Sequence, residues 1–370
     1  MDVHLLAVCL VLALTAGPGT ALPHHLGVNT DTVKQMTIES YPSKRDYGDK
    51  IAATIAAVPY QKAKPEAVLH YNLGVRLLQE NILRAQSEAE LVSPIPAVAG
   101  RLGLRELVDL VTRSGLKQTL ESAGPFTLFG PTDDAFSSLP DWAKKEMDNA
   151  TLLADVLKFH VVPGKLLSKR LANEMQISTL EGRKLRFNVY STGTKTVATA
   201  QCAPIDLSRV DQAASNGVIH VLNGVMIPPA GNIVHTLSAC GVFKTLMGAV
   251  QIAGLGDLLA SPGPFTVFAP TDKAFGKLPP GVLEDLLNNP KELVQILTYH
   301  VVSGTYCSAG LTTGNVQTLE GQAVAVSVSA GGIFVNECKV IYADGGVTNG
   351  VVHAVDTVLL PPGHSLVTLH

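Results

Sequence analysis

Four histidines inside apolar runs are the residues of this chain best suited to chemistry. His160 and His220 lie in one half of the repeated region, and His300 and His353 lie in the other. A histidine beside a nucleophile and a carboxylate could act as the base of a hydrolase. The sequence has no G-x-S-x-G elbow, no H-E-x-x-H motif and no phosphate-binding loop. We therefore expect hydrogen-bonded core histidines, with no enzymatic activity, no cofactor and no metal.

Cysteine is the second residue type with possible chemistry. Cys9 lies in an apolar N-terminal run, which leaves Cys202, Cys240, Cys307 and Cys338. Four cysteines allow three pairings, and their spacing does not choose among them. Because there is no C-x-x-C motif, the sequence gives little support to a zinc or redox site.

The elements that position these residues occur twice. The stretch GPFTLFGPTDDAFSSLP begins at Gly124, and GPFTVFAPTDKAFGKLP begins at Gly263, an offset of 139 residues. They share 12 of their 17 positions, which chance does not produce. One module is therefore present twice, and function should be considered module by module.

The repeated stretch predicts a strand, a tight turn and a short helix. Its FTVF run suits a buried strand, which Pro270 should end because proline has no N–H to donate. Thr271 can cap the helix that follows, and Asp272 favours the positive end of its dipole. The first copy has Thr132 and Asp133 at the same places.

A structural role for the late histidines follows from this arrangement. We hypothesise that His220 and His353 hydrogen-bond the turns around Thr132–Asp133 and Thr271–Asp272. Each bond would tie the end of a module to its first repeated stretch.

Other repeated segments define the fold class. FHVVPG at 159–164 matches YHVVSG at 299–304, and NGVIHVLNGVMIPP at 216–229 matches NGVVHAVDTVLLPP at 349–362. Asn-Gly pairs open the last two segments and are strong hairpin signals. Helical patterns come early in each module and strands come late. This order favours an α+β fold over a parallel α/β sheet.

The FTVFAPTDxAF block, the YHVV element and the NGVxHxxDxVLLPP block together resemble the fasciclin-type domain. The resemblance holds in both modules and covers roughly 270 of the 370 residues. It implies two tandem wedge-shaped β-sandwich domains flanked by helices, from a family of secreted or surface adhesion and matrix proteins. The second module is closer to the family pattern, since the first has Gly130, Phe159 and Asn223 where the second has Ala269, Tyr299 and Asp356.

The resemblance also suggests a partner-binding motif. In matrix members of the family, a Tyr-His pair with flanking aliphatic residues belongs to an integrin-binding motif. The matching residues are Tyr299 and His300, with Ile296 and Leu297 before them. The alternative is that they form the core end of a helix. Because the chain has no Arg-Gly-Asp tripeptide, a simple loop ligand for integrins is excluded.

A disulfide between modules is implied in the same way. Long matrix relatives join the late part of one module to the segment after the YHVV element of the next. The matching residues are Cys202 and Cys307. A Cys307–Cys338 bridge within the second module is the alternative.

Composition excludes some classes of partner. The chain is 46% hydrophobic and 16% charged, with a mean hydropathy of +0.25 and a net charge of −3. Residues 101–230 hold 15 basic and 13 acidic residues, and residues 231–370 hold 5 and 9. Neither half has the basic surplus of a nucleic-acid-binding protein.

The N-terminus predicts export. Leu5 to Ala16 is an apolar run too short to span a bilayer, and small residues follow it. We expect a signal peptide, with a buried helix or a membrane anchor as the alternatives. Asn149 begins an N-x-T sequon and is a possible glycan site. The expected organisation is signal peptide 1–21, extension 22–92 with one amphipathic helix near 65–90, fasciclin-type domains 93–229 and 230–363, and tail 364–370.

These observations predict a secreted protein of the extracellular matrix without a transmembrane segment. It would act by binding integrins, matrix proteins or glycans, with two modules contributing avidity. The alternative is a secreted carrier of a small hydrophobic ligand or a glycan, which would need an apolar pocket of several hundred Å³. Oligomeric state is left open.

Overall fold

A computed structural model describes residues 93–192 and 195–363, which belong to one structural unit. The predicted signal peptide, the extension with its helix near 65–90 and the tail from 364 lie outside the described residues. Within the described part, no helix is both long enough and apolar enough to cross a membrane. We call residues 93–229 the first module and residues 230–363 the second module.

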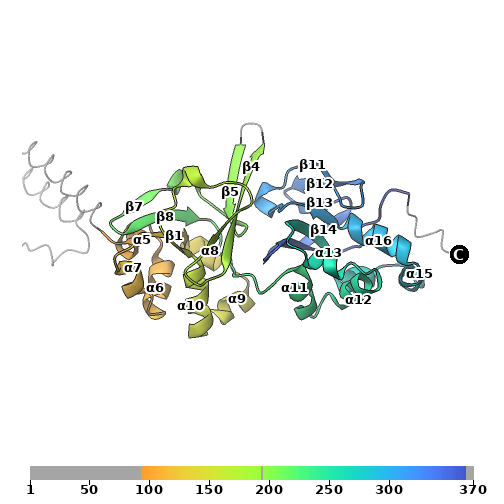
Figure 1. Ribbon diagram of the computed structural model, residues 1–370, viewed down its shortest axis with the longest axis horizontal. Coiled ribbons are helices and arrows are strands. Elements are labelled where there is room, and N and C mark those ends of the chain that lie inside the picture. Colours follow the sequence, from red (N-terminus) through yellow and green to blue (C-terminus); the bar gives the residue numbers. More distant parts are fainter. Residues whose placement is uncertain (1–92, 193–194, 364–370) are drawn as a thin grey trace, which may run out of the picture. The chain divides into compact units, whose positions relative to one another are not determined.

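The first module combines six α-helices with eight strands among its described residues (Figure 1). Its helices are α5 (Ile95–Arg101), α6 (Arg105–Arg113), α7 (Lys117–Glu121), α8 (Asp133–Ser137), α9 (Asp141–Glu146) and α10 (Ala150–Phe159). Its strands are β1 (Phe126–Pro131), β2 (Val161–Pro163), β3 (Met175–Ser178), β4 (Lys184–Thr192), β5 (Lys195–Ala200), β6 (Ala203–Pro204), β7 (Gln212–Ala214) and β8 (Gly217–Leu222).

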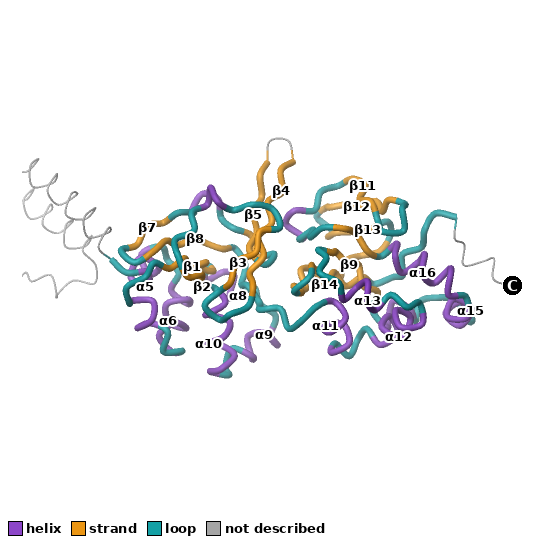
Figure 2. The backbone as a smooth tube through the Cα atoms, in the orientation of Figure 1, coloured by secondary structure: helices purple, strands orange, loops and turns teal. Residues whose placement is uncertain are grey.

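The second module repeats this order of elements. Its helices are α11 (Ile233–Ala239), α12 (Lys244–Ile252), α13 (Gly256–Ala260), α14 (Asp272–Phe275), α15 (Val282–Asn288) and α16 (Pro290–Tyr299). Its strands are β9 (Phe265–Pro270), β10 (Val301–Ser303), β11 (Gly314–Gln317), β12 (Ala323–Ser329), β13 (Gly332–Val335), β14 (Cys338–Val347) and β15 (Gly350–Val355). In both modules most of the helices lie on one side of the strands (Figure 2).

The two repeated blocks of each module lie side by side as a parallel pair. In the first module, β1 pairs with β8 from Phe126 opposite Gly217 to Pro131 opposite Leu222. Strands β9 and β15 form the same pair in the second module. The parallel pair lies inside sheets whose other pairs are antiparallel, ordered β2-β1-β8-β7 with β3-β4-β5-β6, and β10-β9-β15-β14-β13-β12-β11. The predicted α+β class is therefore confirmed.

The central strands are buried on both faces. Leu128 of β1 packs in a helix-side cluster with Leu107, whereas its neighbour Phe129 packs in a second cluster with Phe187. In β9, Val267 likewise packs in one cluster and its neighbour Phe268 packs in another. Adjacent side chains point to opposite faces of a strand, so a continuous apolar run is what such a strand needs.

The glycines at the predicted hairpins are required by a close approach of a neighbouring strand. Strands β7 and β8 form one hairpin and β14 and β15 form another, as the Asn-Gly pairs predict. Gly350 lies at φ +149°, and a Cβ there would overlap the carbonyl oxygen of Phe265. A Cβ at Gly217 would overlap the carbonyl oxygen of Phe126 in the same way. The glycines therefore allow the two repeated blocks to approach.

Candidate functional site: the loops that join the modules

The predicted cap residues occupy helix N-termini and also reach the next layer of helices. Thr132 accepts a hydrogen bond from the Ala135 amide at 3.2 Å, and Thr271 caps α14 in the same way. The carboxylate of Asp133 accepts from the Glu106 amide at 2.9 Å. Asp272 accepts from the Thr245 amide at 2.8 Å. Each aspartate therefore holds the start of a second helix, which the sequence did not indicate.

The late histidines are fully buried, but their predicted hydrogen-bond partners were wrong. His220 donates from Nε2 to the Leu166 carbonyl at 2.8 Å, and its Nδ1 accepts from the Asp211 amide at 3.3 Å. His353 donates to the Tyr306 carbonyl at 2.8 Å and accepts from the Asp344 amide. Neither bonds the capped turn. Both instead hold the loop that follows the YHVV or FHVV element.

We call residues 164–170 the first docking loop and residues 304–310 the second docking loop. A threonine on the neighbouring strand fixes the start of each loop. Thr127 donates to the Gly164 carbonyl at 2.7 Å and accepts from the Leu166 amide at 2.8 Å. Thr266 makes the equivalent pair of bonds to the second docking loop.

An aspartate fixes the end of each loop. Asp211 accepts from the Ser168 amide at 2.8 Å, and Asp344 accepts from the Ser308 amide at 2.7 Å. Both serine hydroxyls also donate to these carboxylates. Although partial burial acts to raise it, the pKa of Asp211 lies below its usual range because the Ser168 bonds favour the ionised form. Both loops therefore have the same three anchors.

The early histidines connect the end of a helix to the closing segment of the module. His160 donates from Nδ1 to the Val156 carbonyl at 2.7 Å and accepts at Nε2 from the Met226 amide. His300 bonds the Ile296 carbonyl and the Leu359 amide in the same way. Burial lowers the pKa of both histidines to about 4. Both rings are thus neutral at physiological pH, and their described hydrogen bonds are to main-chain groups.

The Tyr-His pair lies in the core of the second module. Tyr299 and His300 are each 1% exposed, and Ile296 and Leu297 are buried beside them. The Tyr299 hydroxyl donates to the Ala323 carbonyl at 3.1 Å and accepts from the side-chain nitrogen of Asn336. These side chains cannot touch a partner unless the end of α16 opens. The binding hypothesis for this pair remains a prediction and requires such an opening.

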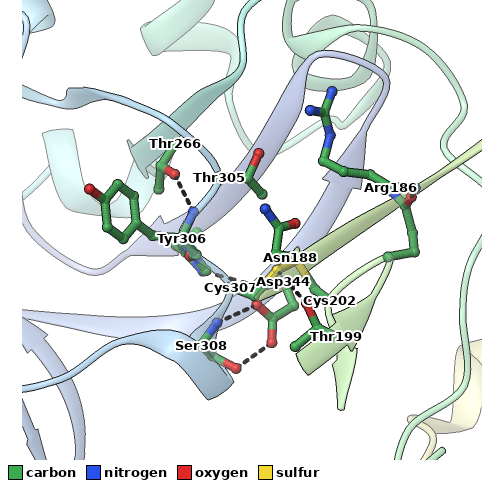
Figure 3. Close-up of a disulfide and its surroundings, with 12 residues drawn as sticks. Arg186, Asn188, Thr199, Cys202, Thr266, Thr305, Tyr306, Cys307, Ser308 and Asp344 are labelled. Atoms are coloured by element: carbon green, nitrogen blue, oxygen red, sulfur yellow. Dashed lines mark hydrogen bonds between the residues drawn. A yellow bond between two sulfur atoms is a disulfide. The ribbon is translucent and has the colours of Figure 1, made fainter. Parts of the chain in front are cut away.

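The second docking loop joins the modules covalently. The structure contains a disulfide between Cys202 and Cys307, which are 105 residues apart in sequence (Figure 3). Both sulfurs are buried. Cys240 is an exposed free cysteine, whereas Cys338 is buried, and burial raises the pKa of its thiol to about 11. The alternative Cys307–Cys338 bridge is absent from the structure.

A tyrosine of the first module closes over the bridge. The Tyr190 hydroxyl donates to the Thr305 carbonyl at 2.9 Å and accepts from the Cys307 amide at 2.9 Å. Its ring lies against Gly310, where a Cβ would overlap it. Burial raises the pKa of Tyr190 above its ordinary value. The phenol therefore stays protonated and keeps its donor.

An ion pair of the first module hydrogen-bonds the second module beside the disulfide. Arg186, whose side chain is 7% exposed, donates to Glu174 at 2.6 Å and to the Thr348 carbonyl at 3.1 Å. Glu174 also accepts from the Asn188 side chain and from the Thr305 amide at 2.9 Å. The junction is therefore a hydrogen-bonded network around a covalent bridge.

Sequence reasoning missed these polar junction residues, although a signal for them existed. Arg186, Asn188 and Tyr190 alternate along β4 and so share one face. The matching face of β12 carries Ala325, Ser327 and Ser329, which are exposed. A comparison of the two copies by strand register would have marked this face of the first module as different.

Removing the Glu174 carboxylate should loosen the junction. Glu174→Ala is expected to lower the free energy of unfolding by about 3 kcal/mol, because it leaves the buried Arg186 guanidinium without its counter-charge. Asp109→Ala is the control, since Asp109 pairs with Arg113, the two side chains are 63% and 55% exposed, and the loss should be about 1 kcal/mol or less. Urea unfolding of both variants measures the difference, and equal losses would contradict the assigned role.

Metal binding and storage of an apolar ligand both receive little support from the described residues. Cys202, Cys307 and Asp344 form a group that could offer three metal ligands among the described residues, but both sulfurs are in the disulfide. An apolar cavity among α12, α13 and α16 has a volume of about 10 Å³. That is room for about one water molecule and not for a lipid-sized ligand.

The predicted glycan site is accessible. Asn149 is exposed and caps α10 through its side-chain oxygen, which accepts from the Thr151 and Leu152 amides at 3.0 and 3.3 Å. Its side-chain nitrogen makes no hydrogen bond to a described residue. Glycosylation of Asn149 remains a prediction.

Comparison with known proteins agrees with this architecture. Residues 102–228 and 241–361 each match the model of the fasciclin domain. The chain is 30% identical over 251 residues to transforming growth factor-beta-induced protein ig-h3 of Sus scrofa, covering 66% of this chain and 36% of that protein. It is 32% identical over 282 residues to periostin of Homo sapiens, covering 73% and 33%. The chain thus spans about a third of the length of these relatives.

A solved structure is also similar to part of this chain. It is the FAS1 domain pair of the insect cell adhesion molecule fasciclin I, at 20% identity and a TM-score of 0.36, covering 70% of this chain and 97% of that one. The family assignment rests on the two matched regions, which together make up most of the chain. The chain belongs to the fasciclin domain family and carries two such domains in tandem.

Proposed function

We propose that this protein is an extracellular adhesion or matrix protein that binds integrins, matrix proteins or glycans through its two fasciclin domains. The junction is the observation that carries the proposal. A disulfide holds the modules as one unit, together with hydrogen bonds of Tyr190 and Glu174 with Thr305 and of Arg186 with Thr348. A fixed pair of binding modules loses less freedom on engaging two sites than a flexibly linked pair does. Membership in the fasciclin domain family and the similarity to periostin support the same function.

The carrier alternative has less support. A carrier would need an apolar pocket of several hundred Å³, whereas the cavity beside α16 has about 10 Å³. The catalytic alternative has less support as well, because the hydrogen bonds of the buried histidines are to main-chain groups. Protein or glycan binding on the outer surface is therefore the proposal to test.

Cell attachment to the immobilised full chain tests this function. We expect adhesion above that on albumin, and capture of extracellular proteins from conditioned medium by the intact chain. Tyr299→Ala/His300→Ala tests the integrin hypothesis. Phe159→Ala/His160→Ala is the matched control, because it removes the corresponding two side chains at the end of α10 in the first module. Loss of attachment in the first variant alone would support binding through Tyr299–His300. Equal loss would assign the pair a purely structural role, and no attachment to the wild-type chain would refute the proposed function.

A further inference from the structure

The two docking loops share their anchors but differ in what covers them. The anchors align Leu166 with Tyr306 and Ser168 with Ser308. In the second docking loop, Thr305 is 5% exposed and Cys307 is fully buried against the first module. The first docking loop has no neighbouring module over it among the described residues. Its side chains at 165, 169 and 170 are exposed.

Three cations occupy these exposed positions. By the alignment, Lys165 replaces Thr305, and Lys169 and Arg170 replace Ala309 and Gly310. Gly310 is the residue that leaves room for the ring of Tyr190, so an arginine at its place could not receive a tyrosine. The first docking loop therefore cannot repeat the junction between the modules. It presents positive charge where the second copy presents a docking surface.

The three side chains are free to bind. None of them forms an ion pair with a described residue, whereas Arg183, Arg186 and Arg209 of the same module are each paired. Asp211, the carboxylate at the base of the loop, accepts hydrogen bonds from the amide and hydroxyl of Ser168, and its single negative charge lies near Lys169. Three positive charges are thus concentrated within six residues and exceed the single negative charge of Asp211 beside them.

The loop is also held rigidly. Thr127, His220 and Asp211 fix its main chain from Gly164 to Ser168, and the Arg170 amide donates to the Leu167 carbonyl. The cations are attached to a fixed backbone, so less freedom is lost when they bind an anion than in a flexible loop. In addition, the whole chain has a net charge of −3, so attraction of a polyanion would have to be local.

We propose that the first docking loop is a binding site for a sulfated glycan, held by Lys165, Lys169 and Arg170. Sulfate groups are ionised at every physiological pH and accept hydrogen bonds from lysine and from the arginine fork. Three cations along one short loop suit a linear polyanion better than a single phosphate. A membrane surface is less suitable, because Leu166 is buried and Leu167 is partly buried, so this loop has no fully exposed leucine to insert. The choice of a glycan rests on the extracellular location in the proposed function.

Heparin affinity of the full chain tests the site. The variant is Lys165→Ala/Lys169→Ala/Arg170→Ala, and its control is Arg105→Ala/Arg113→Ala/Lys145→Ala, which removes the same charge from exposed positions on α6 and α9. We expect the loop variant to bind heparin about tenfold or more weakly, from three exposed ion pairs. The control should bind as the wild type does. Binding of the wild type should weaken as salt rises.

Two further probes separate the possible anions. Desulfated heparin should bind much more weakly than heparin, and vesicles containing phosphatidylserine should bind weakly to the wild-type chain. Equal loss in the loop and control variants, equal binding of desulfated heparin, or preferred binding to vesicles would each overturn the proposal. Heparin binding that persists without any cell attachment would refute the adhesion function while keeping the site. Cell attachment without heparin binding would refute the glycan site while keeping the adhesion function.

Discussion

Cys202→Ala/Cys307→Ala is expected to lower the free energy of unfolding by about 4 kcal/mol. The bridge closes a loop with a sequence separation of 105 residues, and cross-links that close long loops restrict the unfolded chain most. Replacing both residues avoids leaving a free thiol at a buried position. Guanidinium unfolding under non-reducing conditions measures the loss.

The same variant should change the shape of the unfolding curve. We expect the wild-type modules to unfold in one transition, since the disulfide and the Glu174–Thr305 bond couple them. Without the bridge, the modules should begin to unfold separately, giving two transitions. Cys240→Ala is the control, because this thiol is exposed and free, and it should leave the curve unchanged. A double variant that unfolds like the wild type, or a Cys307–Cys338 bridge found by non-reducing peptide mapping, would refute the assigned role.

Acid should destabilise the protein between about pH 6.5 and pH 4. Burial lowers the pKa of His160 and His300 to about 4, whereas unfolding returns both to about 6.5. The unfolded state therefore binds more protons in this window, and stability falls as pH falls through it. Each histidine should contribute about 3 kcal/mol, so the two together should remove about 6 kcal/mol between pH 7 and pH 4.

His220 and His353 should also make the folded protein less stable as the pH falls. Burial also lowers the pKa of His220 and His353, although the nearby Asp211 and Asp344 act to raise it. Protonation would place a hydrogen on Nδ1 of each ring, where a main-chain amide now donates. Acid should therefore weaken the anchors of both docking loops as well.

Single variants separate this titration from other acid effects. His300→Gln should be less stable than the wild type at pH 7, because the Ile296 carbonyl loses the donor that Nδ1 of the ring supplies. Its stability should also fall less between pH 6.5 and pH 4. The exposed His235 provides the control, and His235→Gln should follow the wild-type profile. Chemical unfolding at a series of pH values measures both slopes, and a wild-type slope in His300→Gln would rule out this histidine as the source.

The local features of this fold could be predicted from the sequence because they depend on neighbours in the chain. The repeat at an offset of 139 residues fixed the presence of two modules. Threonine caps at Thr132 and Thr271, the buried strands before them and the Asn-Gly hairpins each follow from a few consecutive residues. The disulfide partners came from the family resemblance, because spacing alone left three pairings open.

The site itself was decided by tertiary structure. His220 bonds a carbonyl 54 residues away, and Tyr190 bonds one 115 residues away. Such contacts depend on how strands and modules align and dock, which single-residue patterns do not encode. Burial of Tyr299 and His300 has the same origin, since a helix end becomes core only when a sheet packs over it. By itself the sequence determined the modules, their class and their caps. Only the folded chain decided that the late histidines hold the docking loops, that one loop joins the modules and that the other presents its charges to solvent.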